Sequence, residues 1–187
     1  MNWPNKLTIL RVILIPFFVV CLMLDTGDGI LRYLALEIFI VASLTDTLDG
    51  YIARKYDLVT NFGKFMDPLA DKLLVCSAMI CFIELGKIPA WVVLIIIARE
   101  FIISGFRLIA SDNGLVIAAS WWGKSKTIVQ MVMIIFLLLD LGVIFTNMTD
   151  VIYIVEQVLI YLSLVLTVIS LVDYIVKNRK VLSDGVK

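Results

Sequence analysis

The 187-residue chain contains no histidine, three cysteines, four prolines and few charged residues, which make up 17% of the total. The absence of histidine excludes histidine-based acid–base catalysis and histidine-ligated zinc. The cysteines lie within apolar runs and do not form a metal-ligand pattern, so we expect free thiols at Cys21, Cys76 and Cys81. Any catalytic chemistry must therefore come from carboxylates, arginine, lysine and bound metal ions.

Apolar residues are what the chain has in excess, since 61% of it is hydrophobic and its mean hydropathy is +1.03. A soluble domain of this size could not bury so much apolar surface, and runs of about 20 apolar residues are typical of membrane-spanning helices. Six such runs occur, at roughly 8–24, 30–53, 65–85, 88–110, 121–145 and 150–176. We therefore predict an all-α, polytopic membrane protein with six transmembrane helices and a short N-terminal interfacial segment, forming a single domain over residues 1–187.

The charged residues are balanced in number, with 16 basic and 16 acidic side chains, but they are separated in position. Acidic residues prevail in the turns after the first, third and fifth runs. Basic residues gather at the opposite ends of the runs, at Lys6, Arg11, Arg54, Lys55, Lys64, Arg107, Lys124, Lys126, Lys177, Arg179, Lys180 and Lys187. Because basic segments stay in the cytoplasm, this distribution predicts that both termini and the loops after the second and fourth helices are cytoplasmic.

Four aspartates occur at helical spacing where the second run ends and the third begins, namely Asp46, Asp49, Asp67 and Asp71. Residues three or four apart share a helix face, so each pair looks one way from its own helix. An ionised side chain among apolar runs is costly unless it has a partner. Four carboxylates that face one another repel, which favours a site for hard divalent cations such as Mg²⁺ or Mn²⁺. The structural alternative is helix capping or ion pairing at the membrane edge.

The aspartates belong to a longer pattern, D-x2-D-G-x2-A-R-x8-G-x3-D-x3-D, which also contains Gly50, Ala53, Arg54 and Gly63. This pattern resembles that of the CDP-alcohol phosphotransferase family, integral membrane enzymes of phospholipid synthesis whose fold has six helices. Three further stretches carry the resemblance, namely residues 4–11 with Pro16, Ala98-Arg99-Glu100 with Arg107, and residues 121–127 with Gln130. Together the stretches span most of the chain.

The resemblance implies a metal centre and a lipid donor. Two Mg²⁺ or Mn²⁺ ions would be held by Asp46, Asp49, Asp67 and Asp71, and Asp71 would also be the general base. The donor would be CDP-diacylglycerol, at a site formed by Asn5, Thr8, Arg11, Asp49, Gly50, Ala53, Arg54 and Gly63. Small residues would let the nucleotide approach the helix backbones, and Arg54 would pair with a phosphate through its planar guanidinium group.

The resemblance also implies an acceptor, sn-glycerol 3-phosphate, whose primary hydroxyl would attack the phosphatidyl phosphorus to give phosphatidylglycerophosphate and CMP. We expect its phosphate to bind a basic pocket formed by Arg99, Arg107, Lys124 and Lys126. The implied setting is the lipid bilayer of the cell (plasma) membrane, with a cytoplasmic active site. The implied partner is a second copy of the chain in a homodimer, and no nucleic acid is expected to bind.

The residues alone leave alternatives open. Another acceptor, such as inositol phosphate or serine, would share the whole aspartate motif, whereas a membrane prenyltransferase would release pyrophosphate instead of CMP. A cation channel or transporter would carry carboxylates near the bilayer midplane in inverted repeats, and the sequence shows no repeat. Lys124 and Lys126 also satisfy the positive-inside rule without any substrate. Arg99 and Glu100 also fit a buried pair that holds the fourth helix, and residues 5–11 fit a simple interfacial helix start.

Overall fold

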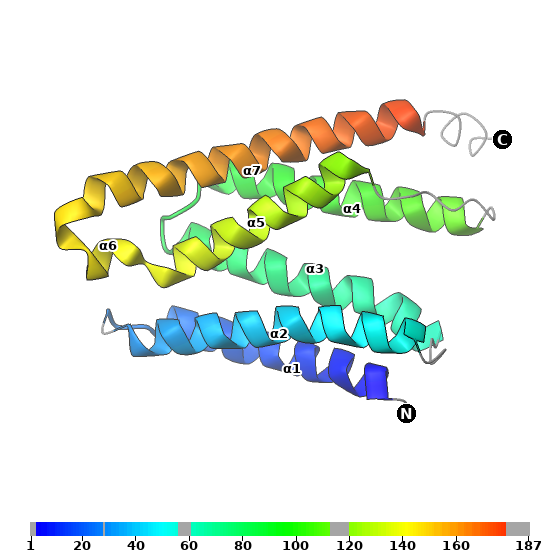
Figure 1. The fold of residues 1–187 in the computed structure, drawn as a ribbon, viewed down its shortest axis with the longest axis horizontal. Coiled ribbons are helices and arrows are strands. Elements are labelled where there is room, and N and C mark those ends of the chain that lie inside the picture. Colours follow the sequence, from blue (N-terminus) through cyan, green and yellow to red (C-terminus); the bar gives the residue numbers. More distant parts are fainter. Residues whose placement is uncertain (1–2, 28, 56–60, 113–119, 179–187) are drawn as a thin grey trace. The chain divides into compact units, whose positions relative to one another are not determined.

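The structure, a computed structural model, describes residues 3–27, 29–55, 61–112 and 120–178 (Figure 1). Its backbone alone is described at residues 3–4, 46–55, 61–62, 64–65, 109 and 111–112. The described residues form helices and turns without any strand, which confirms the all-α prediction. Cys21, Cys76 and Cys81 form no disulfide and keep their thiols, as predicted.

The long helices lie at the positions of the predicted apolar runs. They are α1 (Trp3–Met23), α2 (Ile30–Lys55), α3 (Asn61–Glu84), α4 (Ala90–Asp112), α5 (Trp121–Leu139) and α7 (Thr149–Lys177), and two short helices, α6 (Leu141–Ile144) and η1 (Thr146–Met148), connect the last two. The chain divides into two compact units, Met1–Lys87 with α1 to α3 and Ile88–Lys187 with α4 to α7.

In the first unit, α1 packs against both α2 and α3 (Figure 1). The buried face of α1 includes Ile15, Phe18 and Leu22, which follow one another at helical spacing. The ring of Phe18 contacts that of Phe39 on α2, with 5.8 Å between the ring centroids. Helices within a membrane associate through van der Waals packing, because lipid is as apolar as these side chains, so the fit of these contacts fixes the register of α1 against its neighbours.

A glycine closes the C-terminal end of α3. Gly86 has a φ of +69°, and the N–H groups of Gly86 and Lys87 donate to the carbonyls of Ile83 and Phe82, each at 2.9 Å. This hydrogen-bond pattern is the Schellman motif, which requires a left-handed residue and therefore favours glycine. The turn that follows ends the first unit.

In the second unit, α7 packs against α5 and α4 (Figure 1). The buried residues of α7 are Ile160, Ser163, Thr167, Ser170 and Tyr174, and those of α5 are Lys126, Gln130, Met133, Ile134, Leu137 and Leu138. Small hydroxyl side chains let helices approach closely within a membrane. The interface is polar where α5 begins and α7 ends, because Lys126 and Ser170 are buried there. Gly123 on α5 lies beside Ser170.

The fifth helix ends earlier than the predicted run, which extends to residue 145. Asp140 adopts a left-handed conformation with φ of +46° and ψ of +50°, and α6 starts directly after it. Aspartate tolerates this conformation better than most residues because its short polar side chain bonds locally. The predicted run is thus divided into α5 and α6.

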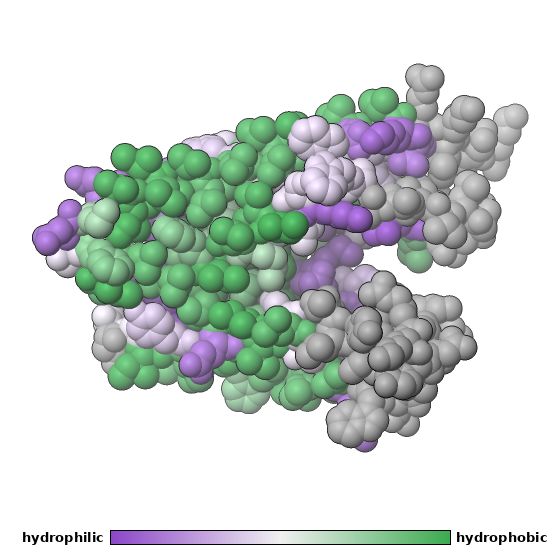
Figure 2. All heavy atoms as spheres, in the orientation of Figure 1, coloured by the Kyte–Doolittle hydropathy of each residue, from purple (hydrophilic) through white to green (hydrophobic). Residues whose placement is uncertain are grey.

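The apolar character of the helices agrees with a membrane protein. Within the described residues, three segments are long and apolar enough to cross a membrane, Asn5–Met23, Trp121–Ile144 and Thr146–Lys177. Figure 2 shows hydrophobic side chains along the sides of the helices and hydrophilic ones gathered toward helix ends. Helices α2, α3 and α4 carry charged side chains such as Asp67 and Arg99, which lower their hydropathy.

Candidate functional site

The aspartate motif lies where α2 ends and α3 begins, and these two helices contact each other. On α2, Ala35, Phe39 and Ala42 are buried at helical spacing. Positions 46 and 49 continue this series along the backbone, since each lies three or four residues beyond the last. The side chains of residues 46–55 lie outside the described residues, so the roles predicted for Asp46, Asp49, Gly50, Ala53 and Arg54 stay predictions.

On α3, the two remaining motif carboxylates differ in their surroundings. Asp67 is half-buried, and its Oδ1 accepts a hydrogen bond of 2.5 Å from the hydroxyl of Thr8. Asp71, one helical turn later, is exposed. Lys72 donates to the carbonyl of Pro68 at 3.3 Å, so it contacts its own helix. Gly63 is buried at the start of the same helix.

The N-terminal part of α1 supplies a polar, buried face to this region. Asn5, Thr8 and Arg11 are buried and continue the apolar series of α1 toward its N-terminus. Arg11 is only 1% exposed, and its Nε donates to the carbonyl of Ala42 on α2 at 3.2 Å. Thr8 contacts α3 and Arg11 contacts α2, so α1 bonds to both helices that carry the motif. Thr8 is therefore in contact with the aspartate motif, and Arg11 bonds α2 one turn before it.

The second unit contains a separate polar cluster on α4, α5 and α7. Arg99 donates through Nη1 to Oε1 of Glu100 at 3.0 Å and through Nη2 to Oγ of Ser170 at 2.5 Å. The ammonium group of Lys126 is bonded to the same Oε1 of Glu100. Arg99 and Lys126 are both buried, 7% and 2% exposed. Two of the four predicted acceptor residues therefore lie in one buried cluster.

The other two predicted acceptor residues, Arg107 and Lys124, are exposed. Lys124 lies two residues before Lys126, in the first turn of α5. That turn begins at Ser120, whose hydroxyl accepts a hydrogen bond from the N–H of Gly123 at 3.2 Å. This N-cap fixes where α5 starts.

Sequence reasoning missed Ser170 as a member of the polar cluster. The available signal was the series Ser163, Thr167 and Ser170, small hydroxyl residues at helical spacing within an otherwise apolar segment. Sequence reasoning considered Glu100 only as a partner of Arg99, because Lys126 is 26 residues away along the chain. Within the described part of the chain, the buried Nε of Arg99 and the buried hydroxyl of Tyr174 have no hydrogen-bond partner.

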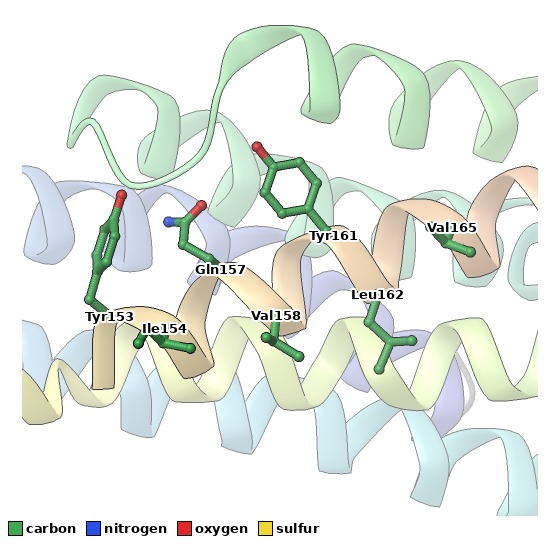
Figure 3. Close-up of a pocket in the computed structure, with 7 residues that line it drawn as sticks. All are labelled: Tyr153, Ile154, Gln157, Val158, Tyr161, Leu162 and Val165. Atoms are coloured by element: carbon green, nitrogen blue, oxygen red, sulfur yellow. The ribbon is translucent and has the colours of Figure 1, made fainter. Parts of the chain in front are cut away.

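A groove of about 470 Å³ along α7 differs in character from both polar regions. Side chains that line it project from both sides of the helix, with Tyr153, Gln157 and Tyr161 on one side and Ile154, Val158 and Leu162 on the other, as Figure 3 shows. The ring of Tyr161 contacts Trp91 of α4, with 6.5 Å between centroids. No residue lining the groove is charged at neutral pH, so it lacks the groups that bind phosphates or metal ions.

The sequence of this chain matches a known family. The model of the CDP-alcohol phosphatidyltransferase family matches residues 1–169, which include the aspartate motif and most of the polar cluster. The chain belongs to this family. Membership confirms the resemblance that the motif indicates.

Relatives within the CDP-alcohol phosphatidyltransferase family align over most of the chain. A CDP-diacylglycerol–glycerol-3-phosphate 3-phosphatidyltransferase of Bacillus subtilis (strain 168) is 40% identical over 148 residues, which cover 74% of this chain and 77% of the relative. A protein of the same name from Haemophilus influenzae is 38% identical over 191 residues, or 100% of this chain and 98% of the relative. A probable phosphatidylglycerophosphate synthase of Mycobacterium tuberculosis is 38% identical, across 94% of this chain and 81% of the relative.

The described motif residues fit the divalent metals that CDP-alcohol phosphatidyltransferases generally use. Asp67 and Asp71 offer carboxylate oxygens one helical turn apart, the ligand type that hard cations prefer. The bond from Thr8 holds Oδ1 of Asp67, as hydrogen bonds to metal-binding carboxylates commonly do. Among side chains that the structure describes, no group of three or more acidic, cysteine or histidine residues could hold a metal. The two motif carboxylates of α2 lie outside that set.

Proposed function

We propose that this protein transfers the phosphatidyl group from CDP-diacylglycerol to sn-glycerol 3-phosphate, giving phosphatidylglycerophosphate and CMP. The proposal is supported by relatives of that name, which align with nearly the whole chain. The structural observation that carries it is the bond from buried Thr8 to Asp67, which ties the predicted donor-binding helix to the aspartate motif. A helix-capping role for the aspartates would not need this bond.

The donor site is assigned to the first unit. Thr8 bonds Asp67 of the motif, Asn5 and Arg11 are buried on the same helix, and Arg11 or Arg54 would pair with donor phosphates. Gly50, Ala53 and Gly63 are small enough for close approach by the nucleotide. Two Mg²⁺ or Mn²⁺ ions, when bound to Asp46, Asp49, Asp67 and Asp71, would balance the carboxylate charge and stabilise negative charge on the pyrophosphate oxygens.

The reaction exchanges one phosphorus–oxygen bond for another. The primary hydroxyl oxygen of the acceptor bonds to the phosphatidyl phosphorus, and the bond from that phosphorus to the CMP oxygen breaks, with CMP keeping the electron pair. The hydroxyl proton passes to a carboxylate oxygen of Asp71. Asp71 suits this role because it is the exposed motif carboxylate of α3, which a substrate hydroxyl can reach.

The acceptor's phosphate is assigned to the second unit, at Arg99 and Lys126 with Arg107 and Lys124. Arg99 combines burial, an unpartnered Nε among the described residues and a planar guanidinium group suited to phosphate. Serine lacks a phosphate that would balance the positive charge these cations carry in excess of Glu100. This favours a phosphorylated alcohol, and inositol phosphate is the second candidate acceptor because it shares that group.

The proposed setting is the plasma membrane, with six transmembrane helices, a short N-terminal interfacial segment and both termini and the active site in the cytoplasm. The distribution of basic residues and the positions of the long helices support this topology. We further propose a single domain over residues 1–187 that assembles as a homodimer.

The test is an assay of purified protein with CDP-diacylglycerol, Mg²⁺ and labelled sn-glycerol 3-phosphate, inositol phosphate or serine. We expect CMP release with glycerol 3-phosphate, and none after chelation of divalent metal. A preference for serine or inositol phosphate would refute the assigned acceptor. Release of pyrophosphate instead of CMP would indicate a prenyltransferase, and metal flux into liposomes without turnover would indicate a transporter.

A further inference from the structure

Glu100 bonds two buried cations through a single oxygen atom. Its Oε1 accepts from Nη1 of Arg99 at 3.0 Å and is also bonded to Nζ of Lys126. Arg99 is its neighbour on α4, whereas Lys126 lies on α5, 26 residues further along the chain. One carboxylate thus sets the separation between a guanidinium group and an ammonium group from different helices.

Ser170 on α7 holds the opposite side of the same guanidinium group, because it accepts from Nη2 of Arg99. Gly123 on α5 lies beside this contact, since a Cβ at that position would be in ordinary van der Waals contact, at 3.6 Å, with both Nη2 of Arg99 and Oγ of Ser170. The guanidinium group is therefore held by Glu100 on its own helix and by Ser170 on α7. Its direction does not depend on substrate being present.

The cluster has the properties of a site for an anion. Nε of Arg99 is buried and has no hydrogen-bond partner among the described residues, and a buried donor in that state needs an acceptor. The formal charges of Arg99, Lys126 and Glu100 sum to +1. A ligand with several negatively charged oxygens would satisfy both features.

We propose that Glu100, assisted by Ser170, is a positioning residue that holds Arg99 and Lys126 at the separation at which both contact the acceptor phosphate. This inference rests on the proposed function, in which those two cations bind the phosphate of glycerol 3-phosphate. Arg99 and Lys126 repel each other, so without a carboxylate between them they move apart. Holding them in advance reduces the ordering that substrate binding would otherwise require.

The direction in which KM for the acceptor changes when Glu100 is made neutral distinguishes a positioning role from a purely electrostatic one. Removing a negative charge near a dianionic substrate strengthens the attraction between the site and that substrate. A Glu100 that acted only through its charge would therefore lower KM for the acceptor when made neutral. A positioning Glu100 gives the opposite sign, because neutralising it releases the two cations.

The experiment compares Glu100→Gln, Glu100→Asp and Ser170→Ala with the wild-type protein in lipid–detergent micelles, varying each substrate in turn. We expect Glu100→Gln to raise KM for glycerol 3-phosphate about tenfold or more, since small displacements of binding groups carry large kinetic costs. Glu100→Asp keeps the charge and should raise it less, and Ser170→Ala should also raise it. KM for CDP-diacylglycerol and the midpoint of thermal unfolding should stay near the wild-type values.

Asp173→Asn is the matched control. Asp173 also pairs with a lysine, Lys177, at 2.7 Å, and its side chain is 17% exposed against 18% for Glu100. It lies outside the polar cluster, so its substitution should leave both KM values unchanged. An increase in the acceptor KM equal to that of Glu100→Gln would overturn the inference.

An unchanged or lowered acceptor KM in Glu100→Gln would also overturn the inference, as would equal increases in KM for both substrates together with a lower unfolding midpoint. If Glu100→Gln fails to fold, Ser170→Ala decides, and an unchanged acceptor KM there overturns the inference. Wild-type protein that releases no CMP with glycerol 3-phosphate would overturn the proposed function, a result that appears before any substitution is made.

Discussion

Replacing Thr8 by valine tests whether the bond between α1 and the aspartate motif contributes to metal binding. Thr8 is fully buried, and its hydroxyl donates to Oδ1 of Asp67 at 2.5 Å. Valine has nearly the same shape, so Thr8→Val removes the donor without opening a cavity. Because Thr8 is shielded from solvent, water cannot easily replace the lost hydroxyl.

The size of the effect follows from the charge of the acceptor. A hydrogen bond to a charged group contributes about 1.5–3 kcal/mol, which corresponds to about 10- to 150-fold in a binding constant. Outer-shell partners of metal ligands typically change metal affinity about 10- to 100-fold. We therefore expect Thr8→Val to weaken metal binding by about 10- to 100-fold.

The assay measures Mn²⁺ binding to the purified protein by titration calorimetry, without substrate, and separately the Mg²⁺ concentration that gives half-maximal CMP release. Thr8→Ser keeps the hydroxyl and should behave like the wild-type protein. Thr167→Val is the matched control, because Thr167 is equally buried but donates to its own helix, to the carbonyl of Ser163 at 2.7 Å. Wild-type Mn²⁺ affinity in Thr8→Val would refute the reasoning.

Three further predictions concern the motif, the acceptor site and the fold. Asp67→Asn should abolish turnover while the protein still inserts into membranes, since it removes a proposed metal ligand; substantial CMP release would contradict this. Lys124→Ala should raise KM for the acceptor by less than about fivefold, since an exposed ion pair contributes about 0.2–1 kcal/mol, and an unchanged KM would remove Lys124 from the site. Gly86→Ala should lower the free energy of unfolding by about 1–2 kcal/mol, because φ is +69° at this position. A Cβ there would meet nothing within 4 Å, so the cost would come from the backbone alone. An unchanged midpoint of thermal unfolding would exclude backbone strain.

Burial separated residues that sequence analysis had treated as equivalent. Lys124 and Lys126 both satisfy the positive-inside rule, and both were predicted to bind the acceptor. In the structure, Lys124 is exposed and Lys126 is buried against Glu100. A two-residue offset turns a side chain to a different face of a helix, but only the packing of α5 against its neighbours decides which face is buried.

The membrane character, the helix positions and the aspartate motif could be read from local order alone. Apolar runs of spanning length report helices because each helix satisfies its own backbone hydrogen bonds, and residues three or four apart share a face in any helix. The contacts from Thr8 to Asp67 and from Lys126 to Glu100 required the folded chain. They join residues 59 and 26 positions apart, and such pairs depend on how helices pack, which no local spacing encodes.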